Sequence, residues 1–547
     1  MPTTEVITMP QDAVSSSARG AIFLIVQQVA SRALTFIFNQ LLLRFLSPAL
    51  LGASVQLELY VISAHHFARE SLRVACQRQP EGGIQAAINL SYLAIASGIP
   101  IVLGLAEWYL STSYPHVPYF PEALRICELA AIVELFSEPA FVAVQQNMMY
   151  KTRAAAESSA VIVKTAATAA MVFWSRYAGV ELGVLPFAAG ELAYCSALTA
   201  VYLWQTASVA RQQNFTLLPK KLKTQKSNSD FILGLFSKSL FNLSLSLYVQ
   251  QGIKYVLTQG DVLVSTALAT LEEQGMYALS ANYGGLIARM VFRPIEDSSR
   301  NLFAQLCASA PGKDSSDASR KKSSTSTRPS QPKANIEQAK TTLALILHSY
   351  SILSLLAFAL GPTAAPLLLQ IVAGSRWSAS GAGEVLGIYC YCIPLLAING
   401  VSEAFVAATA STRELHWQSI WMGAFSAAFA TSAYVFLRVL EMGAKGLVWA
   451  NCVNMALRII FNLYFVQSFF QRRHGLRYSI GDILPSIYAT AGAVVVPGLL
   501  KQTSGMLDRH GLLGELVRVG AVGAGLVLFI ALTERRFILD CWRRARS

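Results

Sequence analysis

The chain has 547 residues, of which 54% are hydrophobic and only 14% are charged, and its mean hydropathy is +0.44. A soluble protein carries roughly a quarter charged residues, so this composition excludes a soluble enzyme and predicts a polytopic membrane protein. We attribute the formal net charge of +13 to basic residues in cytoplasmic loops rather than to a nucleic-acid-binding surface.

The polar N-terminal tail, residues 1–20, lacks the basic start of a secretory signal peptide. The apolar run after it is too long for a cleaved signal, so we expect it to remain as the first transmembrane helix. Further runs near the roughly 20 residues needed to cross a bilayer predict an all-α fold with about 14 transmembrane helices. The predicted spans are 21–45, 51–68, 84–110, 122–148, 155–177, 184–208, 231–257, 276–306, 341–372, 385–410, 417–440, 446–470, 480–500 and 512–532.

The connecting segments alternate in charge. Most of the 44 Lys and Arg residues fall in the segments on the same side as the N-terminus, which predicts that both termini are cytoplasmic. Two of these cytoplasmic segments are long and polar, 209–230 and 311–337. The second is rich in Ser, Lys and Pro without apolar periodicity, so we expect a disordered basic linker.

A short sequence repeats six spans later. Ser137-Glu138-Pro139-Ala140-Phe141-Val142-Ala143 returns, one residue shorter, as Ser402-Glu403-Ala404-Phe405-Val406-Ala407. A chance match between short apolar words is the alternative. As a true repeat, it predicts two six-helix bundles, 21–208 and 231–470, related by a pseudo-two-fold axis along the membrane normal. Residues 471–547 then form two additional helices and a basic cytoplasmic tail.

The stretch 272–298 is an apolar helical segment that carries Arg289, Arg293 and Glu296 at or near membrane depth. A charge near the bilayer centre costs roughly 2.5–3.5 kcal/mol, so a charge retained there usually faces a protein interior or an aqueous cavity. Snorkelling of the two arginines to the membrane surface is the alternative. The segment therefore suggests a polar cavity between helices.

Motifs for the commonest reactions are missing from the sequence. It contains no phosphate-binding loop of an ATPase, no G-x-S-x-G and no H-E-x-x-H, so we expect translocation rather than catalysis. The eight cysteines lack zinc-ligand spacing, and we expect buried free thiols, no metal and no cofactor. Cationic residues within the spans favour a phosphate or pyrophosphate ligand. Glu138 and Glu403 either accept sugar hydroxyls or form structural ion pairs with neighbouring cations.

Several blocks of the sequence resemble the eukaryotic Rft family. They are FNQLLLRFLSP (38–48), FARESLRVAC (67–76), AIVELFSEP (131–139), EQGMYALSANYGGLIARMVFRPIEDS (273–298), LLAINGVSEAF (395–405) and WANCVNMALRI (449–459). The resemblance implies a protein of the endoplasmic reticulum membrane that translocates the mannosylated dolichol-pyrophosphate oligosaccharide of N-glycosylation from the cytosolic to the luminal leaflet. It also implies similarity to the multidrug, oligosaccharidyl-lipid and polysaccharide exporter superfamily, with its two six-helix bundles.

The resemblance also implies which residues contact the substrate: Arg32, Arg69, Arg73, Lys254, Arg289 and Glu296. The implied partners are the dolichol-pyrophosphate-linked oligosaccharide, membrane lipids and other N-glycosylation proteins, and no nucleic acid. A non-transporting accessory protein that binds the glycolipid is the main alternative function. An ion-coupled drug exporter is a third, disfavoured by cations beside the acidic residues of the first bundle.

Overall fold

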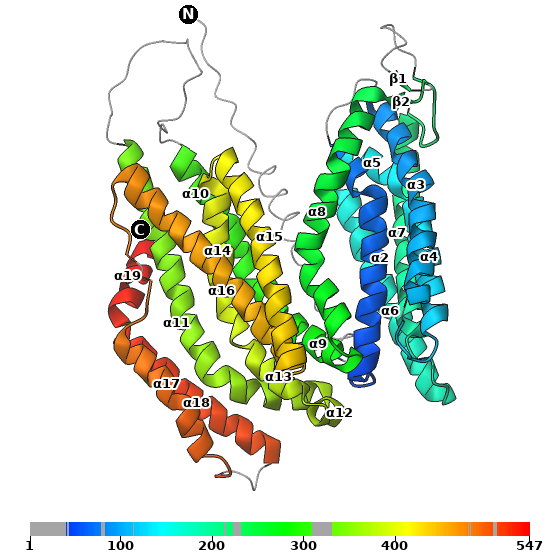
Figure 1. Cartoon of the computed structure of the whole chain (residues 1–547). Helices are drawn as coiled ribbons and strands as arrows, with labels where there is room; N and C mark the ends of the chain where they lie inside the picture. Colours follow the sequence, from blue (N-terminus) through cyan, green and yellow to red (C-terminus); the bar gives the residue numbers. More distant parts are fainter. Residues whose placement is uncertain are drawn as a thin grey trace, which may run out of the picture. The chain divides into compact units, whose positions relative to one another are not determined.

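The computed structural model describes residues 40, 43–77, 83–112, 114–212, 215–222, 231–232, 234–308, 331–479, 481, 483–506 and 511–546. These residues are almost wholly helical, as the composition predicts (Figure 1). The chain divides into two compact units, Met1–Tyr255 and Val256–Ser547. Most of the predicted first span, including Arg32, lies outside the described residues.

Seven described helices are long and apolar enough to cross a membrane. They are Gly83–Thr112, Lys151–Ala178, Lys333–Ala373, Ala382–Thr409, Arg413–Val439, Ala444–Arg472 and Gly511–Thr533. Several apolar helices in one chain confirm the prediction of a multi-pass membrane protein. The count of about 14 remains a prediction.

The N-terminal unit is a helical bundle with one small β-ribbon. Its elements are α2 (Pro48–Ala75), α3 (Gly83–Thr112), α4 (Phe120–Leu135), α5 (Glu138–Gln146), α6 (Tyr150–Ala178), α7 (Leu185–Gln212), β1 (Phe231–Ile232), β2 (Phe236–Ser237) and the first part of α8 (Lys238–Leu268). The two strands are antiparallel, with Phe231 opposite Ser237. Asn89, fully buried on α3, anchors the segment between α7 and α8, since its Nδ2 donates to the Lys220 and Leu235 carbonyls at 2.7 and 2.8 Å.

The predicted span 122–148 is broken into α4 and α5. Pro139 has no N–H to donate to the carbonyl of Leu135, where α4 ends, and α5 begins at Glu138. The later copy of the repeat lacks this proline, and Glu403 is followed directly by Ala404. There α14 (Cys392–Thr409) continues without a break through Ser402-Glu403. The presence or absence of this proline thus accounts for a broken helix in one unit and an intact helix in the other.

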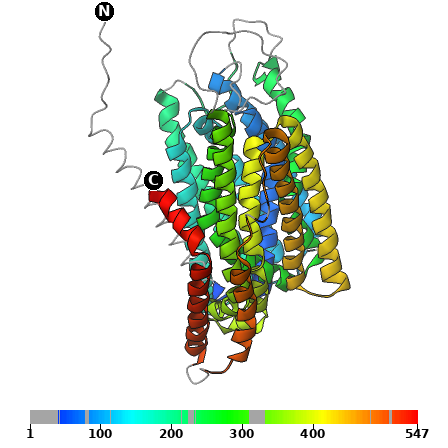
Figure 2. The ribbon, with the colours of Figure 1, turned by 90° about the vertical axis from the view of Figure 1, so that its left-hand side faces the viewer.

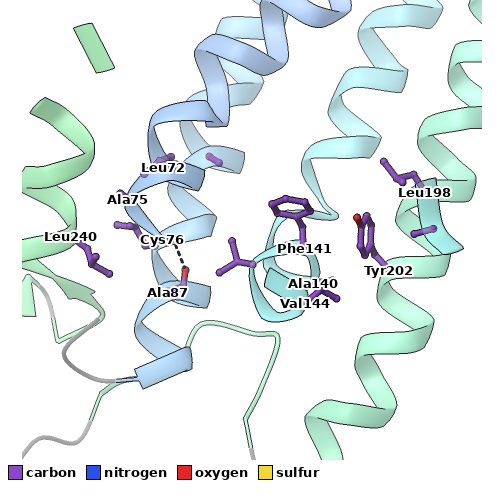
Figure 3. Packing of buried hydrophobic residues seen from close by; sticks show 14 of the residues in the cluster. Leu72, Ala75, Cys76, Ala87, Ala140, Phe141, Val144, Leu198, Tyr202 and Leu240 are labelled. Carbon is purple, nitrogen blue, oxygen red and sulfur yellow. Dashed lines mark hydrogen bonds between the residues drawn. The ribbon is translucent and has the colours of Figure 1, made fainter. Parts of the chain in front are cut away.

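The core around α5 fixes this break. Phe141 lies between the α2–α3 pair and α7, and its ring meets the Tyr202 ring edge-on at a centroid distance of 6.0 Å (Figure 3). Cys76 at the end of α2 donates a weak hydrogen bond to the Ala87 carbonyl of α3 at 3.7 Å. Short α5 is therefore held by apolar packing on three longer helices.

The C-terminal unit contains the remaining helices. They are α9 (Leu271–Ile287), η2 (Ala288–Phe292), α10 (Arg293–Ala308), α11 (Gln331–Ala373), α12 (Ser375–Ala379), α13 (Ala382–Tyr389), α14, α15 (Thr412–Tyr434), η3 (Val435–Val439), α16 (Ala444–Ser468), η4 (Phe469–Arg473), α17 (Ile487–Gln502), α18 (Gly511–Thr533) and α19 (Arg535–Arg546). The π-helical turn η2 directly precedes Pro294, whose missing N–H disturbs the regular ladder.

Helix α11 begins at Gln331, inside the range 311–337 expected as linker. Ile336 and Ala339 are buried in one apolar cluster with Leu343 and Leu347. This helical spacing gives the first turns of α11 a packed face, and such a face stabilises a helix more than its composition suggests.

The last helices pack on α11. Ala493 of α17 and Val519 of α18 share an apolar cluster with Ala359, and α19 turns away from the axis of α18 (Figure 2). Glu534, between α18 and α19, accepts a hydrogen bond from the Ser486 amide at 2.6 Å. Partial burial alone would raise the pKa of Glu534, but the Ser486 N–H and His348 hold it below its usual value.

One cysteine prediction is wrong. Cys392 of α14 and Cys452 of α16 form a disulfide, with Cα atoms 5.5 Å apart. They are separated by 60 residues, and only the packing of α14 on α16 brings them together. Cys390 is buried and free, as expected.

A glycine on α3 tests the packing of the N-terminal unit. A Cβ at Gly98 would lie 2.6 Å from Leu135 Cδ1 and 3.0 Å from Ala68 Cβ. We expect Gly98→Ala to destabilise the protein by about 1–3 kcal/mol because the helices must separate. Thermal unfolding in detergent, followed by the reaction of buried cysteines with a thiol-reactive dye, measures this.

Gly104→Ala is the matched control on the same helix, since nothing lies within 4 Å of its Cβ position. Alanine is the better helix former by roughly 1 kcal/mol, so this change should be neutral or stabilising. Equal losses in the two variants would contradict the close packing at Gly98.

Candidate functional site

Four charged side chains meet inside the N-terminal unit. Arg69 and Arg73 lie one turn apart on α2, facing the break between α4 and α5. Arg69 donates to Glu134 Oε1 at 2.7 Å and to Glu138 Oε1 at 2.9 Å. Arg73 donates from Nε to Glu138 Oε2 at 2.9 Å and from Nη2 to Glu138 Oε1 at 2.5 Å. We call these four residues the charge cluster.

The charge cluster is enclosed. Its Glu138 side chain is 1% exposed, against 11% for Arg69 and 20% for Arg73. The guanidinium carbon of Arg73 lies 3.8 Å from the centre of the Phe141 ring, a cation–π contact. Cys195 of α7 donates to Glu134 Oε2 at 3.1 Å. Both carboxylates therefore accept several hydrogen bonds, as buried charges require.

The charges of this cluster balance, because two guanidinium groups face two carboxylates. This geometry supports structural ion pairing for Glu138. Arg73 is the more exposed of the two cations, and its Nη1 makes no hydrogen bond to any residue of the described ranges. An arginine with a donor left over can bind an anion while its other nitrogens stay paired.

Glu296 and Glu403, the two predicted carboxylates of the C-terminal unit, lie on the helices α10 and α14, which pack against each other. Glu296 of α10 lies 3.6 Å from Arg300 and packs against α14, where a Cβ at Gly400 would be 2.9 Å from its Oε2. Glu403 of α14 accepts a hydrogen bond from Asn399 Nδ2 at 3.1 Å. Buried Asn462 of α16 donates in turn to Asn399 Oδ1 at 3.3 Å. Glu403 is thus oriented by a chain of buried amides.

Glu403 opens onto a cavity of about 410 Å³ between α8, α14, α15 and α16. Its polar lining combines both signs of charge with amides and hydroxyls: Asp261, Glu403, Ser419, Ser426, Asn451, Asn454 and Arg458. Apolar side chains complete the wall, among them Met422 and Phe429. A cavity of this size is typical of sites that hold small organic ligands.

The other predicted residues are placed separately. Lys254 is exposed on α8, and Arg289 lies in η2, where its side chain is outside the described set. The structure therefore brings Arg69, Arg73 and Glu138 together in one unit, and places Glu296 and Glu403 on the packed helices α10 and α14 of the other. Within the described ranges, no group of three or more His, Cys, Asp or Glu residues is arranged to hold a metal ion.

Sequence reasoning missed Glu134, Asp261 and Asn451. The first had a signal, because Glu134 and Glu138 have the same four-residue spacing as Arg69 and Arg73. Residues four apart lie on one helix face, so two matched pairs on neighbouring spans indicate an ion-pair network. Asp261 and Asn451 had none, since only the tertiary structure brings residues of α8 and α16 into the lining of one cavity.

Known sequences place this chain in a family. The sequence model described as Rft protein matches residues 16–544. The chain belongs to the Rft protein family. A relative from Mus musculus is 32% identical over 485 residues, 84% of each chain, and one from Saccharomyces cerevisiae is 30% identical over 496 residues, 83% of each chain. Both are named "Man(5)GlcNAc(2)-PP-dolichol translocation protein RFT1".

Solved structures resemble this Rft protein in fold. An inward closed conformation of the lipid II flippase MurJ matches with a TM-score of 0.60 at 12% identity, covering 94% of this chain and all of that one. An inward-facing multidrug transporter of the MATE family matches with a TM-score of 0.51 at 12% identity, covering 79% of this chain and 93% of that one. This Rft protein therefore shares its helical fold with transporters of the superfamily that the sequence suggested.

The charge cluster makes a prediction about stability. Glu138→Gln removes the buried carboxylate that pairs with the partly buried Arg73 and removes one of the two carboxylates that pair with Arg69. Breaking a buried ion pair on one side costs about 3–5 kcal/mol. We therefore expect a large fall in the thermal unfolding midpoint, measured in detergent by the same cysteine-reactivity assay.

Glu157→Gln is the control, because the Arg153–Glu157 pair spans one turn of α6 and both side chains are nearly half exposed. Such a pair contributes at most about 0.5 kcal/mol. If Glu138→Gln were as mild as Glu157→Gln, the charge cluster would not be a stabilising element.

Proposed function

We propose that this chain translocates Man(5)GlcNAc(2)-PP-dolichol across the endoplasmic reticulum membrane, from the cytosolic to the luminal leaflet. Membership of the Rft family, through relatives that are named for this translocation and cover more than four fifths of the chain, carries the proposal. The cost of moving a sugar through the hydrocarbon of a membrane also supports the proposal. Each sugar hydroxyl that enters hydrocarbon without a partner costs roughly 4–8 kcal/mol, so a large glycolipid requires a protein-lined path.

The architecture we propose has about 14 transmembrane helices, with two six-helix bundles and two further C-terminal helices. The described spans and the separate packing of α17 and α18 on α11 support it. Both termini lie in the cytoplasm in this scheme, on the side that the basic connecting segments favour. No ATP-hydrolysing part is included, and the chain acts as a transporter rather than an enzyme.

The pyrophosphate of the substrate is bound by cations in this proposal. Arg32, Arg69, Arg73, Lys254 and Arg289 supply positive charge, and Arg73 makes the contact in the N-terminal unit through its remaining donor. Arg69, Glu134 and Glu138 hold Arg73 in position. Glu296 and Glu403 serve the saccharide, because carboxylates accept hydrogen bonds from hydroxyl groups.

Reconstitution tests the proposal. Purified protein is placed in liposomes with a labelled pyrophosphoryl-dolichol oligosaccharide, and transfer between leaflets is timed by the fraction that an added lectin captures. We expect the protein to accelerate transfer. Arg73→Gln should slow it about tenfold or more, since a charge-assisted hydrogen bond contributes about 1.5–3 kcal/mol.

Arg211→Gln, an exposed arginine at the end of α7, is the control and should transfer like the unchanged protein. Transfer no faster than in protein-free liposomes, with the glycolipid still bound, would overturn the proposal. The chain would then be an accessory glycolipid-binding protein.

A further inference from the structure

The cavity of the C-terminal unit contains hydrogen-bonding groups that have no partner among the described residues. Asn451 of α16 is 7% exposed, and its side-chain amide makes no hydrogen bond to the described residues. The same holds for the amide of Asn454 and the hydroxyl of Ser426. Buried amides and hydroxyls are normally hydrogen-bonded, so groups left open around a cavity indicate that a polar ligand completes them.

Arg458, a cation of this cavity, makes no close ion pair with a described carboxylate, and Asp261 interacts with it only over a longer distance. Arg458 donates from Nη2 to the thioether sulfur of Met422 at 2.8 Å, and it forms no ion pair with any residue of the described set. It lies halfway along the membrane span Ala444–Arg472. A thioether is a weak acceptor for one of five N–H donors, and a charge at this depth normally has a functional partner.

The mixture of groups decides the class of ligand. Arg458 disfavours a metal cation, while Asp261 and Glu403 disfavour a phosphate. Amide donors, carboxylate acceptors and hydroxyls around one space match a neutral molecule with many hydroxyl groups. The Phe429 ring adds an apolar wall, and the volume of about 410 Å³ is far larger than a bare ion needs.

Hydrogen bonding fixes the orientation of the Glu403 carboxylate before a ligand binds. Its Oε2 accepts from Asn399, which is fixed by Asn462, and Ser402 next to it also accepts from Asn462 at 3.2 Å. A carboxylate whose orientation is set by buried amides loses little freedom on binding, and this increases affinity. The amide chain leaves the other oxygen, Oε1, for the ligand.

We propose that this cavity is a saccharide subsite that binds hexose hydroxyls through Asn454, Arg458 and Glu403. The inference rests on the proposed function and adds to it the site where the sugar part of the glycolipid is recognised. The two parts of the substrate then bind at different places. Cations bind the pyrophosphate, and this polar cavity binds the saccharide.

Binding of a soluble probe tests the subsite apart from transport. The purified chain in nanodiscs is titrated calorimetrically with a mannopentaose that carries neither phosphate nor lipid. We expect Arg458→Met and Asn454→Leu each to weaken binding at least tenfold. The two variants remove different groups, a guanidinium and an amide. The unfolding midpoint of each is measured as well, so that a loss of binding caused by misfolding is detected.

Two exposed positions on α15 and η3 provide controls. Arg438→Met removes an arginine and Thr431→Val removes a hydroxyl outside the cavity, and both should bind the probe like the unchanged protein. Binding unaffected by the two cavity variants would overturn the subsite. So would the absence of probe binding together with thermal stabilisation by Na⁺ that Asp261→Asn abolishes, because the cavity would then be an ion site.

The outcomes also separate this inference from the proposed function. Probe binding that depends on the cavity, without glycolipid transfer in liposomes, retains the subsite and removes the translocation. Glycolipid transfer, together with probe binding that the cavity variants do not change, would support the translocation and contradict the subsite.

Discussion

A charge buried inside a protein is costly unless it is paired, and the charge cluster of α2, α4 and α5 is how the N-terminal unit meets this constraint. Glu138 accepts from both Arg69 and Arg73, while Glu134 takes the remaining side of Arg69. The cluster needs the helix break at Pro139, because the break places the end of α4 and the start of α5 against the same face of α2. The Phe141 ring lies against the Arg73 guanidinium and, with its apolar neighbours, shields that side of the cluster from solvent.

The C-terminal unit handles the same constraint differently. Its polar groups at membrane depth are only partly satisfied, since Arg458 has a thioether partner and Asn451 has none among the described residues. A structural role would favour closure, as in the charge cluster. Open groups around a cavity suit a molecule that is bound and released, whereas the charge cluster stabilises its unit and leaves only one donor of Arg73 for a ligand.

The helical membrane fold followed from composition and from apolar runs, because hydrocarbon thickness fixes the length of a span. The resemblance to the Rft family pointed to Arg69 and Arg73, and the repeated segment in a predicted span pointed to Glu138. Glu134 was visible only as a matching four-residue spacing. The disulfide between Cys392 and Cys452 and the cavity around Arg458 depend on how helices 60 residues or more apart pack together, and local pattern does not encode that packing. The break in the predicted span 122–148 was signalled by Pro139, although a proline in a span can also leave a helix only kinked.

Chemical labelling measures the difference between the enclosed carboxylates of the charge cluster and the carboxylates that line the cavity. The folded protein in membranes is treated with an apolar carbodiimide, which modifies accessible carboxyl groups. The modified peptides are then mapped by mass spectrometry. The account predicts that Glu403 and Asp261 are modified, while Glu134 and Glu138 react only after unfolding. Modification of Glu138 in the folded protein, with Glu403 protected, would contradict the contrast between the enclosed charge cluster and the open cavity.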